Sequence, residues 1–164
     1  MSALRRKLGD VYRISLTDGN FGFMQHVAND ATQLGSAVVL VLRKTYPPSA
    51  TFAFEKELVR DGFFAHVFLK AGKILHIWEH FHWLQPVVQG PIPVIWAICS
   101  VKDMQLDTSR HWKLWRTNDE MHAPSSQEEL TNAELGLVIS PPQIVQRIEH
   151  GAYLIRYPRR ILVA

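Results

Sequence analysis

The sequence predicts a mainly β fold, in the form of a strongly bent antiparallel sheet or a small barrel with one or two short helices. Two observations predict it: apolar runs of strand length recur along the 164 residues, and turn signals separate them without alternating β-α units. Residues 1–164 are expected to form a single domain, with a β core at about 8–100 and a strand-loop-helix-strand extension at 101–164. The pieces after the polar stretch 118–132 are too small to fold alone.

The first two predicted strands form a hairpin. Residues 9–16 and 21–28 are rich in strand-forming side chains, and the intervening turn at 17–20 contains Asp-Gly. This pair favours a tight hairpin because glycine readily adopts positive φ. Gly22, flanked by two phenylalanines, indicates a bulge or a place where another part of the chain comes close.

The middle of the chain predicts three further strands. Residues 37–46 are almost continuously apolar, which is typical of a strand covered on both faces. Residues 52–60 are ambiguous between helix and strand. Residues 63–70 and 73–83 are predicted to form a second hairpin that turns at Ala71-Gly72.

The C-terminal half mixes short strands with helical segments. Strands are expected at 94–101, 111–116 and 153–157. A turn of helix is expected near 126–130, with serine as its cap. A longer helix should begin at Ser140, since proline follows in its first turn, and it should end at a glycine.

Composition and charge limit the classes of protein that fit. The chain is 47% hydrophobic and 20% charged, as expected of a folded domain rather than a disordered one. No apolar run is long enough to cross a membrane, and no apolar stretch follows the basic N-terminus as in a signal peptide. Cys99 is the single cysteine and is expected to be a buried thiol. These features predict a cytoplasmic protein.

The charges are unevenly distributed along the chain. Residues 117–150 contain six acids and one base, a net charge of −5, whereas the remainder contains 17 bases and nine acids, a net charge of +8. Such asymmetry steers charged partners without identifying them.

The run from Gly9 to Phe23, Gly-Asp-Val-Tyr-Arg-Ile-Ser-Leu-Thr-Asp-Gly-Asn-Phe-Gly-Phe, resembles the immunity protein 26 family of bacterial polymorphic-toxin systems. A weaker likeness is the turn Gly72-Lys73, followed by a tryptophan-containing strand over 74–83 and then Pro86. The resemblance covers about residues 8–100. It implies a mainly β cytosolic antidote that binds the C-terminal domain of a cognate toxin, delivered for example by contact-dependent inhibition. It supplies no catalytic residue and no cofactor.

The acidic segment is the predicted site for that partner. Many delivered toxins are nucleases, whose active sites are basic because they hold phosphate, and carboxylates on an inhibitor complement such a site. The whole chain is nevertheless basic, at +3, so either the toxin has an acidic face elsewhere or the antidote binds outside the active site. The predicted toxin-binding residues are Trp112, Trp115, Asp119, Glu120, Glu128, Glu129 and Glu134.

Two alternatives compete with a protein partner. On a regular strand over 73–83, His76, His80 and His82 share one face and could ligate zinc in a metal enzyme. However, the sequence has no His-Glu-x-x-His pattern, phosphate loop or nucleophile elbow, so no catalytic residue, metal or cofactor is expected.

The other alternative is a small nucleic-acid-binding β domain. Exposed aromatic rings can stack on bases while cationic side chains contact phosphate, and Trp112 and Trp115 are the candidate rings. The candidate cations are Arg5, Arg6, Lys7, Arg43, Lys44, Lys113, Arg116, Arg159 and Arg160.

Overall fold

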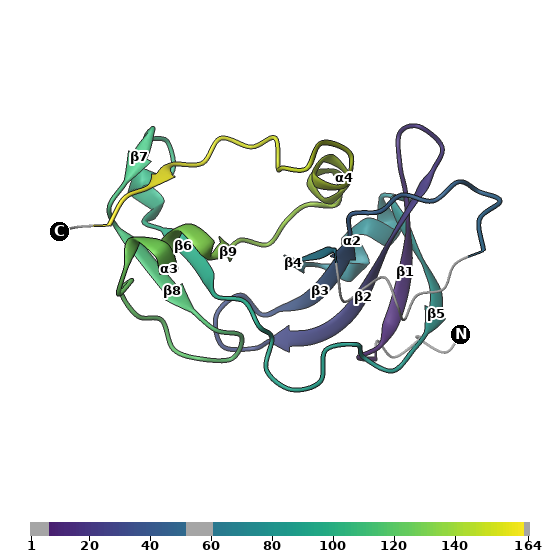
Figure 1. The fold of residues 1–164 in the computed structure, drawn as a ribbon, viewed down its shortest axis with the longest axis horizontal. Helices are drawn as coiled ribbons and strands as arrows, with labels where there is room; N and C mark the ends of the chain where they lie inside the picture. The colour runs from purple at the N-terminus through teal and green to yellow at the C-terminus, as the bar shows by residue number, and fades with distance from the viewer. Residues whose placement is uncertain (1–6, 52–60, 163–164) are drawn as a thin grey trace.

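The computed structural model describes residues 7–51 and 61–162, and its largest element is a five-stranded antiparallel sheet (Figure 1). The order of its strands is β4-β3-β2-β1-β5. The ambiguous segment 52–60 lies outside the described residues. The five strands are β1 (Asp10–Ser15), β2 (Phe21–Asp30), β3 (Ser36–Leu42), β4 (Gly62–Val67) and β5 (Trp78–Trp83).

The predicted first hairpin is confirmed as the antiparallel pair β1–β2, in which Arg13 lies opposite Phe23. The Asp18 carboxylate accepts a hydrogen bond from the Asn20 N–H at 2.9 Å and holds the turn. Gly22 marks a close approach, since a Cβ there would lie 3.0 Å from Ile148 Cδ1. The bulge in β2 instead lies further along the strand, at 26–28.

Strand β3 has both faces covered, as predicted. Val38 to Leu42 are buried and alternate between two apolar clusters, one on each side of the sheet. On one side the sheet packs against α4 (Pro141–His150), through Ile144 and Ile148. On the other side it packs against Trp96 and Trp115, which come from a second, smaller sheet.

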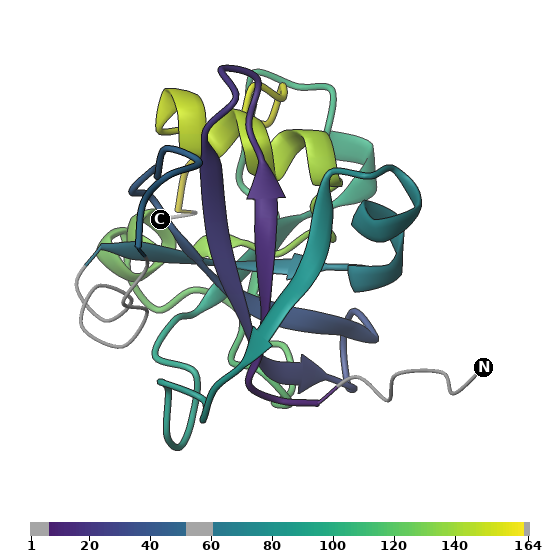
Figure 2. The same ribbon diagram turned by 90° about the vertical axis from the view of Figure 1, so that its right-hand side faces the viewer.

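The predicted hairpin at 63–83 is wrong. Ala71 and Gly72 lie inside a helix, α2 (Leu69–Ile74), and the chain then crosses the sheet to pair β5 with β1. The physical reason is the Trp78 indole, which packs directly on Gly72 and donates its N–H to the Leu69 carbonyl at 2.9 Å. Strand β5 therefore lies at the sheet edge, next to β1 (Figure 2).

The second part of the molecule is a smaller β unit beside the main sheet (Figure 1). Its three-stranded sheet has the order β8-β6-β9, with β6 antiparallel to β8 and parallel to β9. A parallel two-stranded pair, β7 with β10, lies beside it. The elements are β6 (Trp96–Cys99), the 3₁₀ turn η1 (Val101–Asp103), β7 (Thr108–Ser109), β8 (Trp112–Trp115), α3 (Gln127–Asn132), β9 (Glu134–Leu135) and β10 (Arg159–Arg160).

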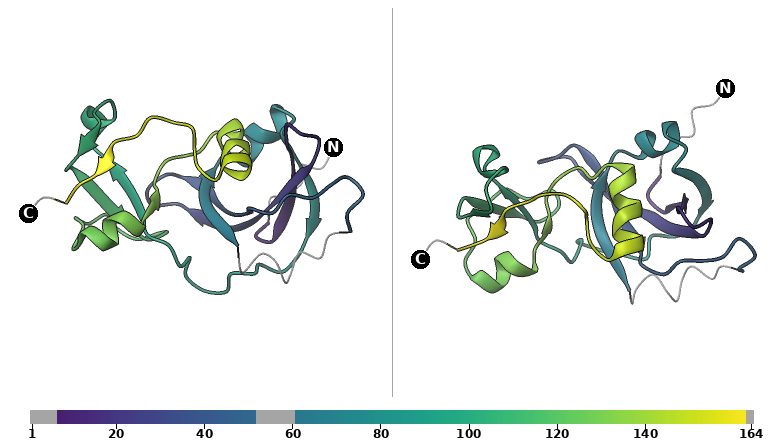
Figure 3. Two further views of the ribbon diagram at one scale, coloured as in Figure 1. Left: turned by 45° about the horizontal axis from the view of Figure 1, so that its top comes forward. Right: turned by 90° about the horizontal axis from the view of Figure 1, so that it is seen from above.

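Both predicted C-terminal helices are confirmed, whereas the predicted strand at 153–157 is wrong. In α4, Ser140 is the N-cap, as expected, and forms a capping box with Gln143, and Gly151 ends the helix at φ +78°. After α4 the chain returns to the smaller unit as an irregular segment and forms a strand only at β10 (Figure 3). Tyr153 and Tyr157 pack inward there, against apolar clusters of the two parts, instead of pairing with a strand.

The mainly β fold class is confirmed. The main sheet is strongly twisted (Figure 2), and within the described ranges it does not close into a barrel. Three short α-helices accompany it in the part of the chain that the structure describes, rather than one or two. None of the helices in the described ranges is long and apolar enough to cross a membrane.

The contact between Gly72 and Trp78 gives a stability prediction. A Cβ at residue 72 would lie 1.9 Å from the Trp78 ring, so Gly72→Ala should lower the free energy of unfolding by about 1–3 kcal/mol through overpacking. Helix propensity alone predicts the opposite sign, a gain of about 1 kcal/mol. Urea unfolding followed by tryptophan fluorescence measures the change, with the neighbouring Lys73→Ala as control. A stabilised Gly72→Ala protein would show that this contact does not hold β5 in place.

Candidate protein-binding surfaces

Asp119 and Glu120 lie on an exposed turn that follows β8. The backbone of this turn is fixed to the β2–β3 connection, because Asn118 Oδ1 accepts from the Ala31 N–H and the Asp119 carbonyl accepts from Gln33 Nε2, each at 2.9 Å. The two carboxylates project from an anchored turn, and no cation among the described residues is paired with them.

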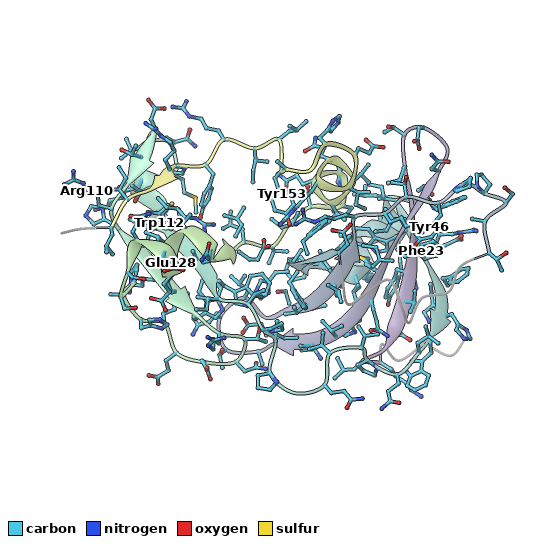
Figure 4. The ribbon with its side chains drawn as sticks, in the orientation of Figure 1. Phe23, Tyr46, Arg110, Trp112, Glu128 and Tyr153 are labelled. Atoms are coloured by element: carbon cyan, nitrogen blue, oxygen red, sulfur yellow. The ribbon has the colours of Figure 1, made fainter. Side chains whose placement is uncertain are left out.

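Glu128, labelled in Figure 4, and Glu129 lie in the first turn of α3, but only Glu128 is exposed. The Glu129 carboxylate accepts hydrogen bonds from Ser125 Oγ at 2.7 Å and from the Ser125 N–H at 2.8 Å. These bonds hold the pKa of Glu129 below its usual value, with a smaller contribution from nearby His122. Glu129 therefore stabilises the start of α3, whereas Glu128 is available to a partner.

Glu134 is neutralised by Arg147. The guanidinium donates to both carboxylate oxygens, at 2.8 and 2.9 Å, and lies 4.0 Å above the Phe63 ring. Both residues line a pocket of about 430 Å³ beside Tyr153, whose pKa burial raises to about 12. The prediction that Glu134 binds the toxin is not supported by this environment, because its charge joins the smaller unit to α4.

The prediction that Trp112 and Trp115 are surface anchors is wrong, and so is the stacking role proposed for nucleic acid. Both are buried, at 4% and 0% exposure. They lie on opposite faces of β8, each covered by a different apolar cluster. Trp112 donates its indole N–H to the Ser109 carbonyl at 2.7 Å, and Trp115 donates to Asp30 Oδ2 at 2.9 Å. Neither ring can reach a partner without unfolding this unit.

The predicted histidine face does not form. His76 precedes β5 and has φ +55°, in the connection from α2. A register shift in β5 places His80 opposite Tyr12 but His82 opposite Val11, so the two histidines lie on opposite faces of the sheet. His80 instead lies 3.1 Å from the Asp10 carboxylate. Within residues 7–51 and 61–162, no three His, Cys, Asp or Glu side chains are arranged to hold a metal ion.

The sequence did not reveal a buried polar network that joins the two parts. Asp30, at the end of β2, is fully buried and accepts hydrogen bonds from Trp115 Nε1 at 2.9 Å and from the Gln33 N–H at 3.2 Å. His66 on β4 is also fully buried, with Nε2 3.7 Å from Asp30 and Nδ1 3.0 Å from Ser36 Oγ. The signal in the sequence that could have indicated this network was the presence of polar residues within otherwise apolar strands.

Serine, histidine and aspartate also form the catalytic triads of hydrolases, but the packing around Ser36, His66 and Asp30 gives them a structural role here. The His66 ring lies 4.1 Å from the Trp96 ring and has no exposed surface, so a substrate cannot reach it. Burial lowers the pKa of His66 to about 4, although the nearby Asp30 carboxylate acts in the opposite direction. His66 is therefore neutral at physiological pH.

An exposed apolar surface surrounds the edge strand β5. Residues 79–83 are all exposed, and Phe81 and Trp83 keep 46% and 49% of their surface accessible. Exposed large hydrophobic side chains adjoin both ends of the strand. The β5 surface, as defined here, consists of Leu8, Ile74, Leu75, Phe81 and Trp83.

No protein-family model, curated protein or solved structure matches the chain.

The low pKa of His66 predicts acid sensitivity. The folded state holds this imidazole neutral down to about pH 4, whereas the unfolded chain protonates it near 6.5. The stability that results from keeping His66 neutral is therefore fully present above pH 6.5. As the pH falls towards 4 this stability is lost, and the free energy of unfolding drops by about 3 kcal/mol. Urea unfolding at several pH values measures it.

Asp30 does not contribute to this change, because hydrogen bonds from Trp115 and Gln33 outweigh burial and hold the pKa of its carboxyl below the ordinary value. His66→Asn should reduce the pH dependence, while His76→Asn, at an exposed position, should leave it unchanged. An equal pH dependence in His66→Asn and the unmodified chain would contradict the assignment.

Proposed function

We propose that this chain is an immunity protein that binds and neutralises a cognate polymorphic or contact-dependent inhibition toxin domain, with nuclease activity expected of the toxin. The observation that carries the proposal is the likeness of Gly9 to Phe23 to the immunity protein 26 family. The same residues form the β1–β2 pair at the centre of the main sheet.

The fold gives a physical reason for the glycines of this motif. Gly9 has φ +99°, and a Cβ there would lie 2.1 Å from the Leu84 carbonyl oxygen. Gly19 has φ +84° in the hairpin turn, and Gly22 accommodates Ile148 of α4. The motif thus specifies a scaffold, and recognition of a toxin must come from the surface around it. In the weaker part of the likeness Gly72 is helical, but the following strand begins at a tryptophan, Trp78.

Three exposed carboxylates remain from the predicted site: Asp119, Glu120 and Glu128. Among the described residues none of them is paired with a cation, so each keeps its charge available to a partner. A nuclease presents a basic surface to its substrate, and opposite charge accelerates encounter and penalises wrong partners. We assign toxin recognition to these three residues and leave Glu129 and Glu134 with structural roles.

A pull-down from lysate of the source cells tests the proposal directly, with the tagged chain as bait and a nuclease-treated sample as control. The expected result is capture of the C-terminal fragment of a large exoprotein that survives nuclease treatment. Coexpression should then protect cells from that toxin domain. Recovery of nucleic acid alone, lost on treatment, would refute the proposal and favour the nucleic-acid alternative.

Charge reversal at the exposed carboxylates gives a sharper prediction. Glu120→Lys combined with Glu128→Lys should weaken toxin binding at least about tenfold, mainly through slower association, and the difference should shrink as salt rises. Association and dissociation rates measured with the captured toxin domain test this. Asp107→Lys, a single reversal at an exposed acid that pairs with Arg156 on the β7 side of the smaller unit, is the control. Equal affinity of all three proteins would exclude the acidic residues but not the toxin itself.

A further inference from the structure

We infer that the β5 surface binds a second copy of this chain, with the two β5 strands paired antiparallel about a twofold axis. The inference concerns a different part of the molecule from the acidic residues and does not depend on the toxin. It begins from the position of β5, which pairs with β1 and with no other strand in the described ranges. An edge strand leaves backbone N–H and C=O groups on its outer side available to another strand.

The distribution of exposed apolar side chains favours a twofold arrangement. Nine large hydrophobic residues are exposed in the described chain, and five of them form the β5 surface. Ile74 and Leu75 precede the strand, whereas Trp83 ends it and donates its indole N–H to the Leu8 carbonyl at 2.9 Å. Antiparallel pairing brings the start of one strand to the end of the other. Each copy would therefore cover the exposed side chains of its neighbour.

The sequence of β5 is nearly self-complementary when reversed. Trp-Glu-His-Phe-His-Trp has an aromatic residue at each end, and reversal places Glu79 opposite His82. These two side chains share a face of the sheet, since they pair with Arg13 and Val11, which are two residues apart on β1. A carboxylate, which also accepts a hydrogen bond from Arg13 of its own chain, and an imidazole thus meet across the axis, rather than two like charges.

The bulge in β5 limits how the two copies associate. It interrupts the strand between its contacts with Val11 and Tyr12, so only a short ladder of backbone hydrogen bonds can form across the edge. Burial of the side chains of the β5 surface must then supply most of the affinity. Substitution of those side chains, rather than of the backbone, is the appropriate test.

Sedimentation equilibrium of the purified chain at about 1–100 µM tests the inference, and the expected result is a reversible dimer. Ile74→Lys and Phe81→Lys should each weaken dimerisation at least about tenfold, since a charge would enter the covered surface. Val101→Lys, at a 78% exposed apolar position in the smaller unit, is the matched control and should dimerise normally. Circular dichroism and thermal unfolding confirm that each variant is folded.

Hydrogen exchange provides a second measurement that does not depend on any substitution. Amides of residues 78–83 should become more protected as the protein concentration rises, whereas those of β8 should not change. A chain that stays monomeric throughout the concentration range would overturn the inference. So would a dimer that Val101→Lys weakens and the two β5 variants leave intact. Neither result bears on toxin capture, which is measured separately.

Discussion

The hydrogen bond from Trp115 to the buried carboxylate of Asp30 sets how the two parts of the molecule fit together. Asp30 is fully buried, and a buried carboxylate is strongly destabilising unless donors surround it. One of its donors is a ring from the other sheet, at 2.9 Å, so the charge is satisfied only while the smaller unit is docked. His66 on β4 contributes to the same contact between the two parts, since its ring packs against Trp96 with the centroids 4.1 Å apart. A polar constraint therefore fixes an orientation that apolar packing alone would leave less specific.

A second constraint decides which surface of the main sheet stays open. Because the Trp78 ring occupies the space above Gly72, residues 69–74 coil into a helix and β5 lies beside β1 instead of β4. The edge of β4 is partly covered, since His66 bridges to Val138 and accepts a hydrogen bond from the Ile139 N–H at 2.7 Å. The edge of β5 has no such cover among the described residues, which makes it the natural place for association.

The sequence predicted the parts of the fold whose signals are local. The Asp-Gly turn, the apolar run of β3 and the serine-proline start of α4 each depend on near neighbours, and each is confirmed. The helix at 69–74 depends on the packing of Trp78 against Gly72, and the burial of Trp112 and Trp115 depends on contacts distant in sequence, so periodicity could reveal neither. The same rule held for the candidate site: features with local signals were predictable, and features set by tertiary contacts were not. The exposure of Glu128 was predictable from its polar surroundings, whereas the pairing of Glu134 with Arg147 required the tertiary structure.

The two proposed binding regions are compatible because they lie on different parts of the molecule. Strand β5 and α3 stand at opposite ends in the view of Figure 1, and Glu128 belongs to the α3 end (Figure 4). A dimer formed through β5 would leave Asp119, Glu120 and Glu128 of both copies exposed. Each dimer would then present two acidic surfaces, and a toxin domain would bind either surface without dissociation of the dimer. The buried joint at Asp30 makes this possible, because it holds the smaller unit, and the carboxylates it carries, in a fixed position relative to the dimerising sheet.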